Sequence, residues 1–173
     1  MKIFVCIKQV ISREWPLHVN EEATWIRLRN AEYELNEPDS YALEAGLRLK
    51  ETYGGEVVVC SAGPERVSQV LREGLARGAD SAIHVLSDDL ETGDGFAVAE
   101  ALAYGLRDEH KDLVLTGLQS DDRGSASTGV SLAEHLGMPH STIIMDIEIS
   151  SDVVRVKREL EGGWFQWISM PLP

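Results

Sequence analysis

The densest group of side chains that could bind a ligand lies in residues 117–129, Gly-Leu-Gln-Ser-Asp-Asp-Arg-Gly-Ser-Ala-Ser-Thr-Gly, between a predicted strand and a predicted helix. Glycine and serine let the backbone approach a ligand closely, hydroxyls donate hydrogen bonds to phosphate oxygens, and a helix start favours negative charge. The segment therefore predicts a phosphate-binding loop. The alternative is an ordinary polar loop in which Ser127 or Thr128 caps the helix.

Two familiar phosphate-binding motifs do not match. Gly124 and Gly129 have the Walker A separation, but Val130 stands where that motif needs lysine. Residues 93–95, Gly-Asp-Gly, resemble the start of GxGxxG, but Val98 replaces the third glycine, so we expect a helix cap there. These patterns favour binding of a phosphate-bearing ligand without hydrolysis of a triphosphate.

Other catalytic or metal-binding patterns are weak. The sequence contains no GxSxG, HExxH or CxxC, and the histidines are scattered without ligand spacing: His18, His84, His110, His135 and His140. The acidic segment 88–94 lacks the ligand order of an EF-hand and is predicted to be a solvated loop. A hydrolase that uses Asp121 or Asp122 with a metal remains a weak hypothesis, and we predict no bond chemistry.

Composition narrows the class of protein. The chain has 173 residues, 43% of them hydrophobic, with 16 Lys and Arg against 29 Asp and Glu, and a net charge of −13. This length predicts one domain, residues 1–173, and the charge disfavours nucleic acid and anionic membranes as partners. We find no signal peptide and no apolar run near the ~18 residues of a membrane span. Cys6 and Cys60 lie in apolar runs, which predicts reduced thiols in a cytoplasmic protein.

The elements that would position the loop alternate along the chain. Apolar strands are predicted at residues 2–9, 56–61, 81–86 and 113–116, and helical stripes at 39–51, 67–75, 98–106 and 128–136. This order predicts an α/β fold: a mainly parallel, doubly wound sheet of about five strands with flanking helices. Ligands of such sheets lie beyond the carboxyl ends of the strands.

Two segments depart from this alternation. Residues 13–35 read as an inserted β-hairpin, and residues 143–149, 153–159 and 164–169 read as antiparallel strands, so hairpin additions are expected near 13–35 and 143–170. Trp164 and Trp167 on the last strand predict either a partner surface or a small local cluster. The apolar residues 170–173 directly after a strand are unusual for a native chain end, so a native end and a truncated sequence both remain open.

Taken together, these segments resemble the β subunit of electron-transfer flavoproteins. The matching segments lie in order through nearly the whole chain, and their order and spacing are more specific than any one of them: residues 5–10 (VCIKQV), 35–39 (LNEPD), 42–51 (ALEAGLRLKE), 61–64 (SAGP), 71–80 (LREGLARGAD), 112–119 (DLVLTGLQ), 128–129 (TG) and 156–163 (VKRELEGG).

The resemblance implies an adenine nucleotide α-hydrolase-like fold and a partner, the electron-transfer flavoprotein α subunit, which carries FAD. The complex would pass electrons from dehydrogenases to a quinone-reducing or similar acceptor, while this subunit holds AMP structurally, or FAD in the electron-bifurcating type. The implied nucleotide site comprises Cys6, Asn36, Asp39, Ala62, Gly117, Gln119, Ser120, Ser125, Ser127, Thr128 and Gly129. The family's C-terminal arm, which embraces the α subunit, has no counterpart in these residues. The alternative function is a stand-alone, homodimeric adenine-nucleotide sensor or stress-type protein that binds ATP.

Overall fold

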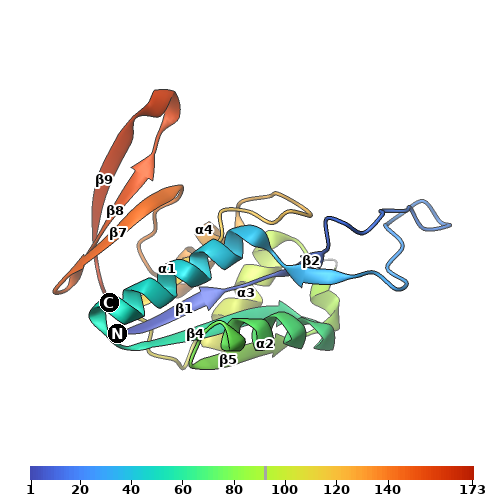
Figure 1. Ribbon diagram of the computed structural model, residues 1–173, viewed down its shortest axis with the longest axis horizontal. Coiled ribbons are helices and arrows are strands. Elements are labelled where there is room, and N and C mark those ends of the chain that lie inside the picture. Colours follow the sequence, from blue (N-terminus) through green and yellow to red (C-terminus); the bar gives the residue numbers. More distant parts are fainter. Residues whose placement is uncertain (92) are drawn as a thin grey trace.

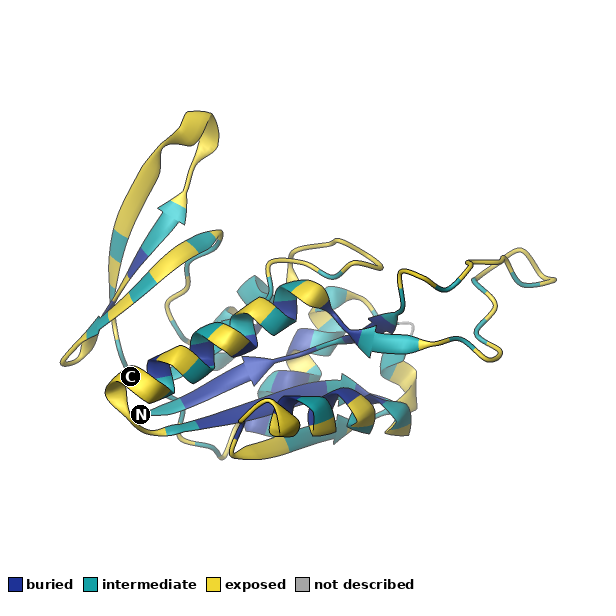
Figure 2. Cartoon of the chain, in the orientation of Figure 1, coloured by how far each residue is buried: buried dark blue, intermediate teal, exposed yellow. Residues whose placement is uncertain are grey.

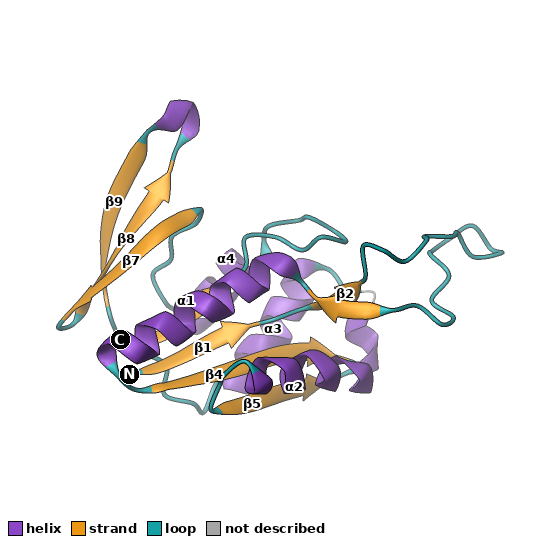
Figure 3. Cartoon of the chain, in the orientation of Figure 1, coloured by secondary structure: helices purple, strands orange, loops and turns teal. Residues whose placement is uncertain are grey.

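The computed structural model describes residues 1–91 and 93–173, and its centre is a parallel β-sheet (Figures 1 and 3). The sheet has four strands in the order β5-β4-β1-β6. Their bounds are Lys2–Cys6 for β1, Glu56–Gly63 for β4, Ser81–Leu86 for β5 and Leu113–Thr116 for β6. All three neighbouring pairs are parallel. The predicted α/β fold is confirmed, with four strands where about five were expected.

Helices cover both faces of this sheet. Their bounds are Glu37–Tyr53 for α1, Ser68–Ala76 for α2, Gly95–Leu106 for α3 and Thr128–Leu136 for α4. The short 3₁₀ turns η1 (Glu65–Val67) and η2 (Asp88–Glu91) precede α2 and α3. The predicted helices are therefore confirmed, and α4 has the predicted bounds. In the described part of the chain, no helix is long and apolar enough to cross a membrane.

The alternation of side chains along β1 explains both layers of the core. Ile3 and Val5 pack in the cluster that contains residues of α1 and α2, whereas Phe4 and Cys6 pack in the cluster that contains residues of α3 and α4. Successive residues of a strand point to opposite faces, so a strand buried on both faces must be apolar throughout. Figure 2 shows the buried residues concentrated on these central strands.

The first predicted strand, residues 2–9, is divided into two elements. After β1 ends at Cys6, β2 (Gln9–Ile11) pairs antiparallel with β3 (Tyr33–Leu35) in a separate sheet. The strand prediction was wrong here because the Lys8 amide donates to the side chain of Asp39 instead of continuing the parallel ladder. The segment between β2 and β3 extends away from the main sheet, and a single bridge joins Val19 to Ile26 (Figure 1).

The last strands form a separate antiparallel sheet, as predicted. It comprises β7 (Ile144–Ser150), β8 (Val153–Glu159) and β9 (Phe165–Pro171), and the turn η3 (Glu161–Gly163) joins the last two. Ile147 and Ile149 of β7 pack against the core between the parallel sheet and helices α1 and α2. Aromatic side chains on and beside β9 are exposed, and Trp164 is the most exposed of them at 75%.

Candidate functional site

A cleft lies at the carboxyl end of the parallel sheet, where β1 and β6 lie side by side. The chain leaves β1 toward α1 on one face and leaves β6 toward α4 on the other face. Such a divergence of neighbouring connections opens a crevice, and ligands of open α/β sheets bind there. All the predicted site residues line this one cleft: Cys6, Asn36, Asp39, Ala62, Gly117, Gln119, Ser120, Ser125, Ser127, Thr128 and Gly129.

The Asp39 carboxylate joins the ends of the two strands. One of its oxygens accepts a hydrogen bond from the Lys8 amide at 2.8 Å, and the other accepts from the Gly117 amide at 2.9 Å. Burial raises the pKa of Asp39 to about 6, although the hydrogen bonds that it accepts act in the opposite direction. A side chain at position 117 would collide with this carboxylate, so the contact requires glycine. Asp39 thus fixes where the loop of residues 117–129 begins.

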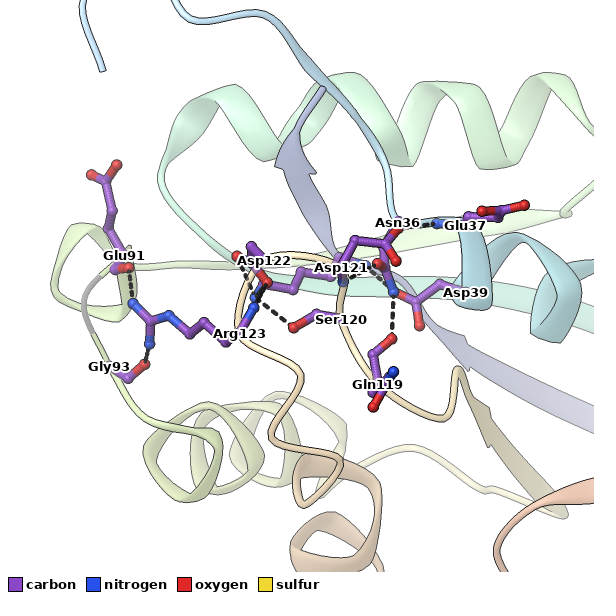
Figure 4. Close-up of polar contacts among 11 residues, drawn as sticks. Asn36, Glu37, Asp39, Glu91, Gly93, Gln119, Ser120, Asp121, Asp122 and Arg123 are labelled. Atoms are coloured by element: carbon purple, nitrogen blue, oxygen red, sulfur yellow. Dashed lines mark hydrogen bonds and ion pairs between the residues drawn. The ribbon is translucent and has the colours of Figure 1, made fainter. Parts of the chain in front are cut away.

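Asn36 holds the next part of the loop in the same way (Figure 4). Its side-chain amide donates to the Gln119 carbonyl at 3.1 Å, and its side-chain oxygen accepts from the Asp121 amide at 3.0 Å. The residue is 1% exposed. Asn36 and Asp39 were predicted as members of the nucleotide site. In the structure, their polar atoms bind the backbone of the loop and thereby set its shape.

Ion pairs hold the outer part of the loop. Lys8 Nζ lies 2.6 Å from the Asp122 carboxylate and donates to Ser120 Oγ at 3.2 Å, while Arg13 pairs with Asp121 at 2.8 Å. Burial opposes ionisation of Asp122, but hydrogen bonds from Lys8 and Ser120 lower the pKa of this carboxyl below its ordinary value. Both aspartates that a metal-dependent hydrolase would need are therefore already paired with cations.

The first turns of α3 and α4 meet at the cleft. A Cβ at Gly95, the first residue of α3, would lie 2.8 Å from Ser127 Oγ and 2.9 Å from Thr128 Oγ1, and 3.6 Å from Ser125 Oγ. Ser127 occupies the N-cap position of α4 but makes no side-chain capping hydrogen bond. Three hydroxyls thus lie beside two helix N-termini, whose free N–H groups attract anions. This arrangement supports the phosphate-binding interpretation of the loop over simple capping.

Gly129 makes the close approach of α4 to the sheet possible. A Cβ there would lie 2.5 Å from Thr116 Oγ1. Because real Cβ atoms do not approach other atoms so closely, only glycine allows the first turn of α4 to sit directly on the end of β6. The position of Thr128 at the cleft depends on this contact.

Cys6 and Ala62 lie on the strand side of the cleft. Cys6 and Cys60 are free thiols whose Sγ atoms lie 3.3 Å apart on neighbouring strands. The hydrogen bond with Cys60 and burial raise the pKa of the Cys6 thiol well above its ordinary value. A neutral, buried thiol contributes shape to the cleft and little charge.

Several residues of the cleft were not among the predicted site residues. Gln9 and Arg66 line it together with residues of the connection between β5 and α3, and Arg123 lines it from within the predicted loop of residues 117–129. Gln9 is 8% exposed and donates to the Arg66 carbonyl and to Gln69, and its buried side-chain oxygen has no hydrogen-bond partner among the described residues. Gln9 and Arg66 reach the cleft only through the fold, because nothing in the local sequence distinguishes them from surface residues.

Two predictions concern the connection between β5 and α3. The predicted cap in residues 93–95 is confirmed, because the Asp94 carboxylate accepts a hydrogen bond from the Ala97 amide at 2.9 Å. The acidic segment 88–94 includes Thr92, which lies outside the described residues. Within residues 1–91 and 93–173, no group of three or more His, Cys, Asp or Glu side chains is placed to hold a metal ion.

A doubly wound sheet with a cleft at its strand divergence defines this protein as an α/β ligand-binding domain. Comparison with protein families is more specific: the model of the electron transfer flavoprotein domain matches residues 24–171. The chain belongs to this family, and it is similar along its length to β subunits.

The relatives show how much of a β subunit these residues cover. The chain is 37% identical to an electron transfer flavoprotein subunit beta of Methylophilus methylotrophus, and the match covers 100% of the chain and 67% of the relative. It is 34% identical to the subunit beta of Clostridium acetobutylicum, over 95% of the chain and 63% of the relative. It is 40% identical to a caffeyl-CoA reductase-Etf complex subunit, CarD, of Acetobacterium woodii, over 100% of the chain and 66% of the relative. The chain therefore spans about two thirds of the length of these relatives.

Proposed function

We propose that this chain is the nucleotide-binding part of an electron transfer flavoprotein β subunit and that its cleft holds AMP. The observation that carries the proposal is the meeting of the first turns of α3 and α4, with the hydroxyls of Ser125, Ser127 and Thr128 between them. Hydroxyls and free helix N–H groups suit a phosphate. The chain has no Walker lysine, so retention of a monophosphate fits better than hydrolysis of a triphosphate.

In this proposal, the nucleotide acts as a structural ligand. The partner α subunit carries FAD, which supplies the redox chemistry of the complex, and dehydrogenases and a further acceptor exchange electrons with that complex. Bound AMP stabilises the folded β subunit by RT ln(1 + [L]/Kd) and thereby keeps the loop of residues 117–129 in one conformation. The free thiols of Cys6 and Cys60 suit a reducing compartment, and we assign the protein to the cytoplasm.

The test is to identify the nucleotide that accompanies the purified protein. Its absorbance is recorded between about 250 and 500 nm, the protein is denatured, and the released compound is identified by mass spectrometry. Release of AMP without a flavin band is the expected result. Released FAD assigns the site to the bifurcating type, and released ATP supports the stand-alone sensor. A protein that releases nothing, and whose melting temperature is unchanged by added AMP, contradicts the nucleotide assignment.

A further inference from the structure

Arg123 crosses the cleft from one loop to the other (Figure 4). It lies in the loop after β6, and its guanidinium donates hydrogen bonds to the carbonyl oxygens of Glu91 and Gly93 in the connection that leads to α3. The bond to Glu91 is 3.0 Å long. The guanidinium carbon also lies 5.4 Å from the centre of the Trp25 ring. Arg123 therefore bridges the two segments whose helices meet at the hydroxyl cluster.

The guanidinium of Arg123 contacts no carboxylate among the described residues, whereas the cations of Lys8 and Arg66 each pair with one. Lys8 lies 2.6 Å from the Asp122 carboxylate, and Arg66 lies 3.1 Å from the Glu91 carboxylate. The contacts of the Arg123 guanidinium among the described residues are two carbonyl oxygens and an aromatic ring, while the backbone amide of Arg123 donates to the Asp122 carboxylate. Its positive charge is thus held by dipoles and is available to a stronger anionic partner.

The cation lies close to the proposed phosphate position. Arg123 binds the carbonyl of Gly93, and Gly95, two residues further on, packs against the hydroxyls of Ser127 and Thr128. Two residues of chain span at most about 7 Å, which a change of side-chain rotamer in arginine can cover. The Asp94 carboxylate caps α3 and offsets part of the positive end of that helix. A phosphate in this position therefore needs positive charge that the two helix ends alone do not supply.

We propose that Arg123 is the specificity-determining residue of the cleft, which selects an adenosine phosphate over unphosphorylated adenosine by moving its guanidinium from the two carbonyls to the phosphate. This inference rests on the proposed nucleotide site. The planar guanidinium offers parallel N–H groups that match two phosphate oxygens, and such charge-assisted bonds are stronger than bonds to neutral carbonyls. The exchange thus favours the phosphorylated ligand and leaves contacts with adenine and ribose unaffected.

Calorimetry with two ligands tests this. The dissociation constants of AMP and adenosine are measured for the nucleotide-stripped wild-type protein, for Arg123→Gln and for Arg107→Gln. Arg107 is the matched control because its guanidinium lies over an aromatic ring, that of Tyr104, is exposed like that of Arg123, and does not line the cleft. We expect Arg123→Gln to weaken AMP by roughly 10- to 100-fold, as loss of charge-assisted hydrogen bonds implies, and adenosine by less than about threefold. Arg107→Gln should change both by less than about threefold.

Other results overturn the proposal. Equal weakening of AMP and adenosine by Arg123→Gln would mean that Arg123 only holds the loops together, and unchanged AMP affinity would remove it from the site. Arg123→Lys separates charge from geometry, because it keeps the cation without the planar fork, and it should lie between wild type and Arg123→Gln. If the wild-type protein binds neither ligand, the proposed nucleotide site itself fails. Failure of the site is thereby distinguished from failure of the arginine assignment.

Discussion

Asp39 and Gly117 are joined by a 2.9 Å hydrogen bond from the glycine amide to a buried carboxylate, which links the start of α1 to the end of β6. Burial raises the pKa of Asp39 from its ordinary 3.8 to about 6. Between pH 3.8 and about 6, Asp39 is therefore protonated in the folded protein but ionised in the unfolded chain. The raised pKa of Asp39 therefore contributes to the free energy of unfolding most strongly below about pH 4, and this contribution is lost as the pH rises through about 6.

This relationship predicts a pH dependence that the variant Asp39→Asn lacks. The difference in unfolding free energy between wild type and Asp39→Asn should fall by about 3 kcal/mol between about pH 3.5 and 7, since each pKa unit corresponds to about 1.4 kcal/mol. Denaturant titrations at a series of pH values measure it, and all other carboxyl groups cancel because both proteins contain them. A constant difference would show that the Asp39 pKa is not raised, and an increasing one would show that the hydrogen bonds outweigh burial.

Replacement of Asn36 should destabilise the protein and loosen the loop. Asn36→Ala leaves the Gln119 carbonyl and the Asp121 amide without their partner, which costs about 2–4 kcal/mol at so buried a position. Asn20→Ala, which removes comparable hydrogen bonds from an exposed turn, should cost less than about 1 kcal/mol. Urea denaturation gives both values. Hydrogen exchange of residues 119–123 should rise only in Asn36→Ala, and unchanged exchange there would refute the role of Asn36 in shaping the loop.

Removal of the Thr128 hydroxyl should weaken nucleotide binding selectively. Thr128→Val keeps the side-chain volume and removes a hydrogen bond to phosphate, so the binding free energy of AMP should fall by about 1.5–3 kcal/mol. Thr52→Val, at the exposed end of α1, is the control and should leave the affinity unchanged. Isothermal titration calorimetry decides the question, and equal affinities for AMP in the Thr128 variant and the wild type would exclude Thr128 from the site.

The close contact at Gly129 predicts that alanine destabilises the protein more at this position than at Gly137, a glycine at another helix terminus. Gly129→Ala introduces a Cβ 2.5 Å from Thr116 Oγ1, and such overpacking should cost about 1–3 kcal/mol and displace α4 from the cleft. Gly137→Ala meets nothing within 4 Å but has a φ of +65°, so it should cost about 1 kcal/mol through strain alone. AMP affinity should fall only in Gly129→Ala. An equal loss of affinity in both variants would indicate a general effect of stability.

Replacement of Trp164 should weaken association with a partner and leave the free energy of unfolding almost unchanged. Its side chain is 75% exposed, so Trp164→Ala should change the unfolding free energy by less than about 0.5 kcal/mol. If the antiparallel sheet contacts the proposed α subunit, the same variant should weaken complex formation with that subunit in sedimentation experiments. Tyr104→Ala, at an exposed aromatic residue on α3, provides the matched control. Identical complex formation by wild type and Trp164→Ala would show that Trp164 is not part of the surface that contacts the partner.

The fold could be predicted because its signals are local. The apolar run of β4 and the stripe of α4 each reflect burial that is already visible in a short window of sequence, and the glycines after the helices mark their ends. The end of the parallel strand at Cys6 was not visible, because Ile7 continues the apolar run. What ends the parallel ladder there is Asp39, a side chain from a distant part of the chain.

The site could be predicted only in part for the same reason. The loop of residues 117–129 has a recognisable composition, and Ser127 and Thr128 stand where a helix begins. Gln9 and Arg66 reach the cleft because of how the strands are ordered, which no spacing in the sequence reveals, and Arg123 was not singled out within the predicted loop. The family resemblance implied Asn36 and Asp39 as site residues without implying that their side chains would bind the backbone of the loop.

The strand order has a consequence for the timing of folding during synthesis. β1 leaves the ribosome before β4 and β6 but lies between them in the sheet, and its last residue, Cys6, pairs with Cys60 and Thr116. β1, which is buried at four of its five residues, therefore has neither neighbouring strand until Glu56–Gly63 has emerged, and its second edge is covered only after Leu113–Thr116 has followed. Contacts of such long sequence separation form slowly. The interval before β6 appears is thus when the nascent chain most needs protection from aggregation.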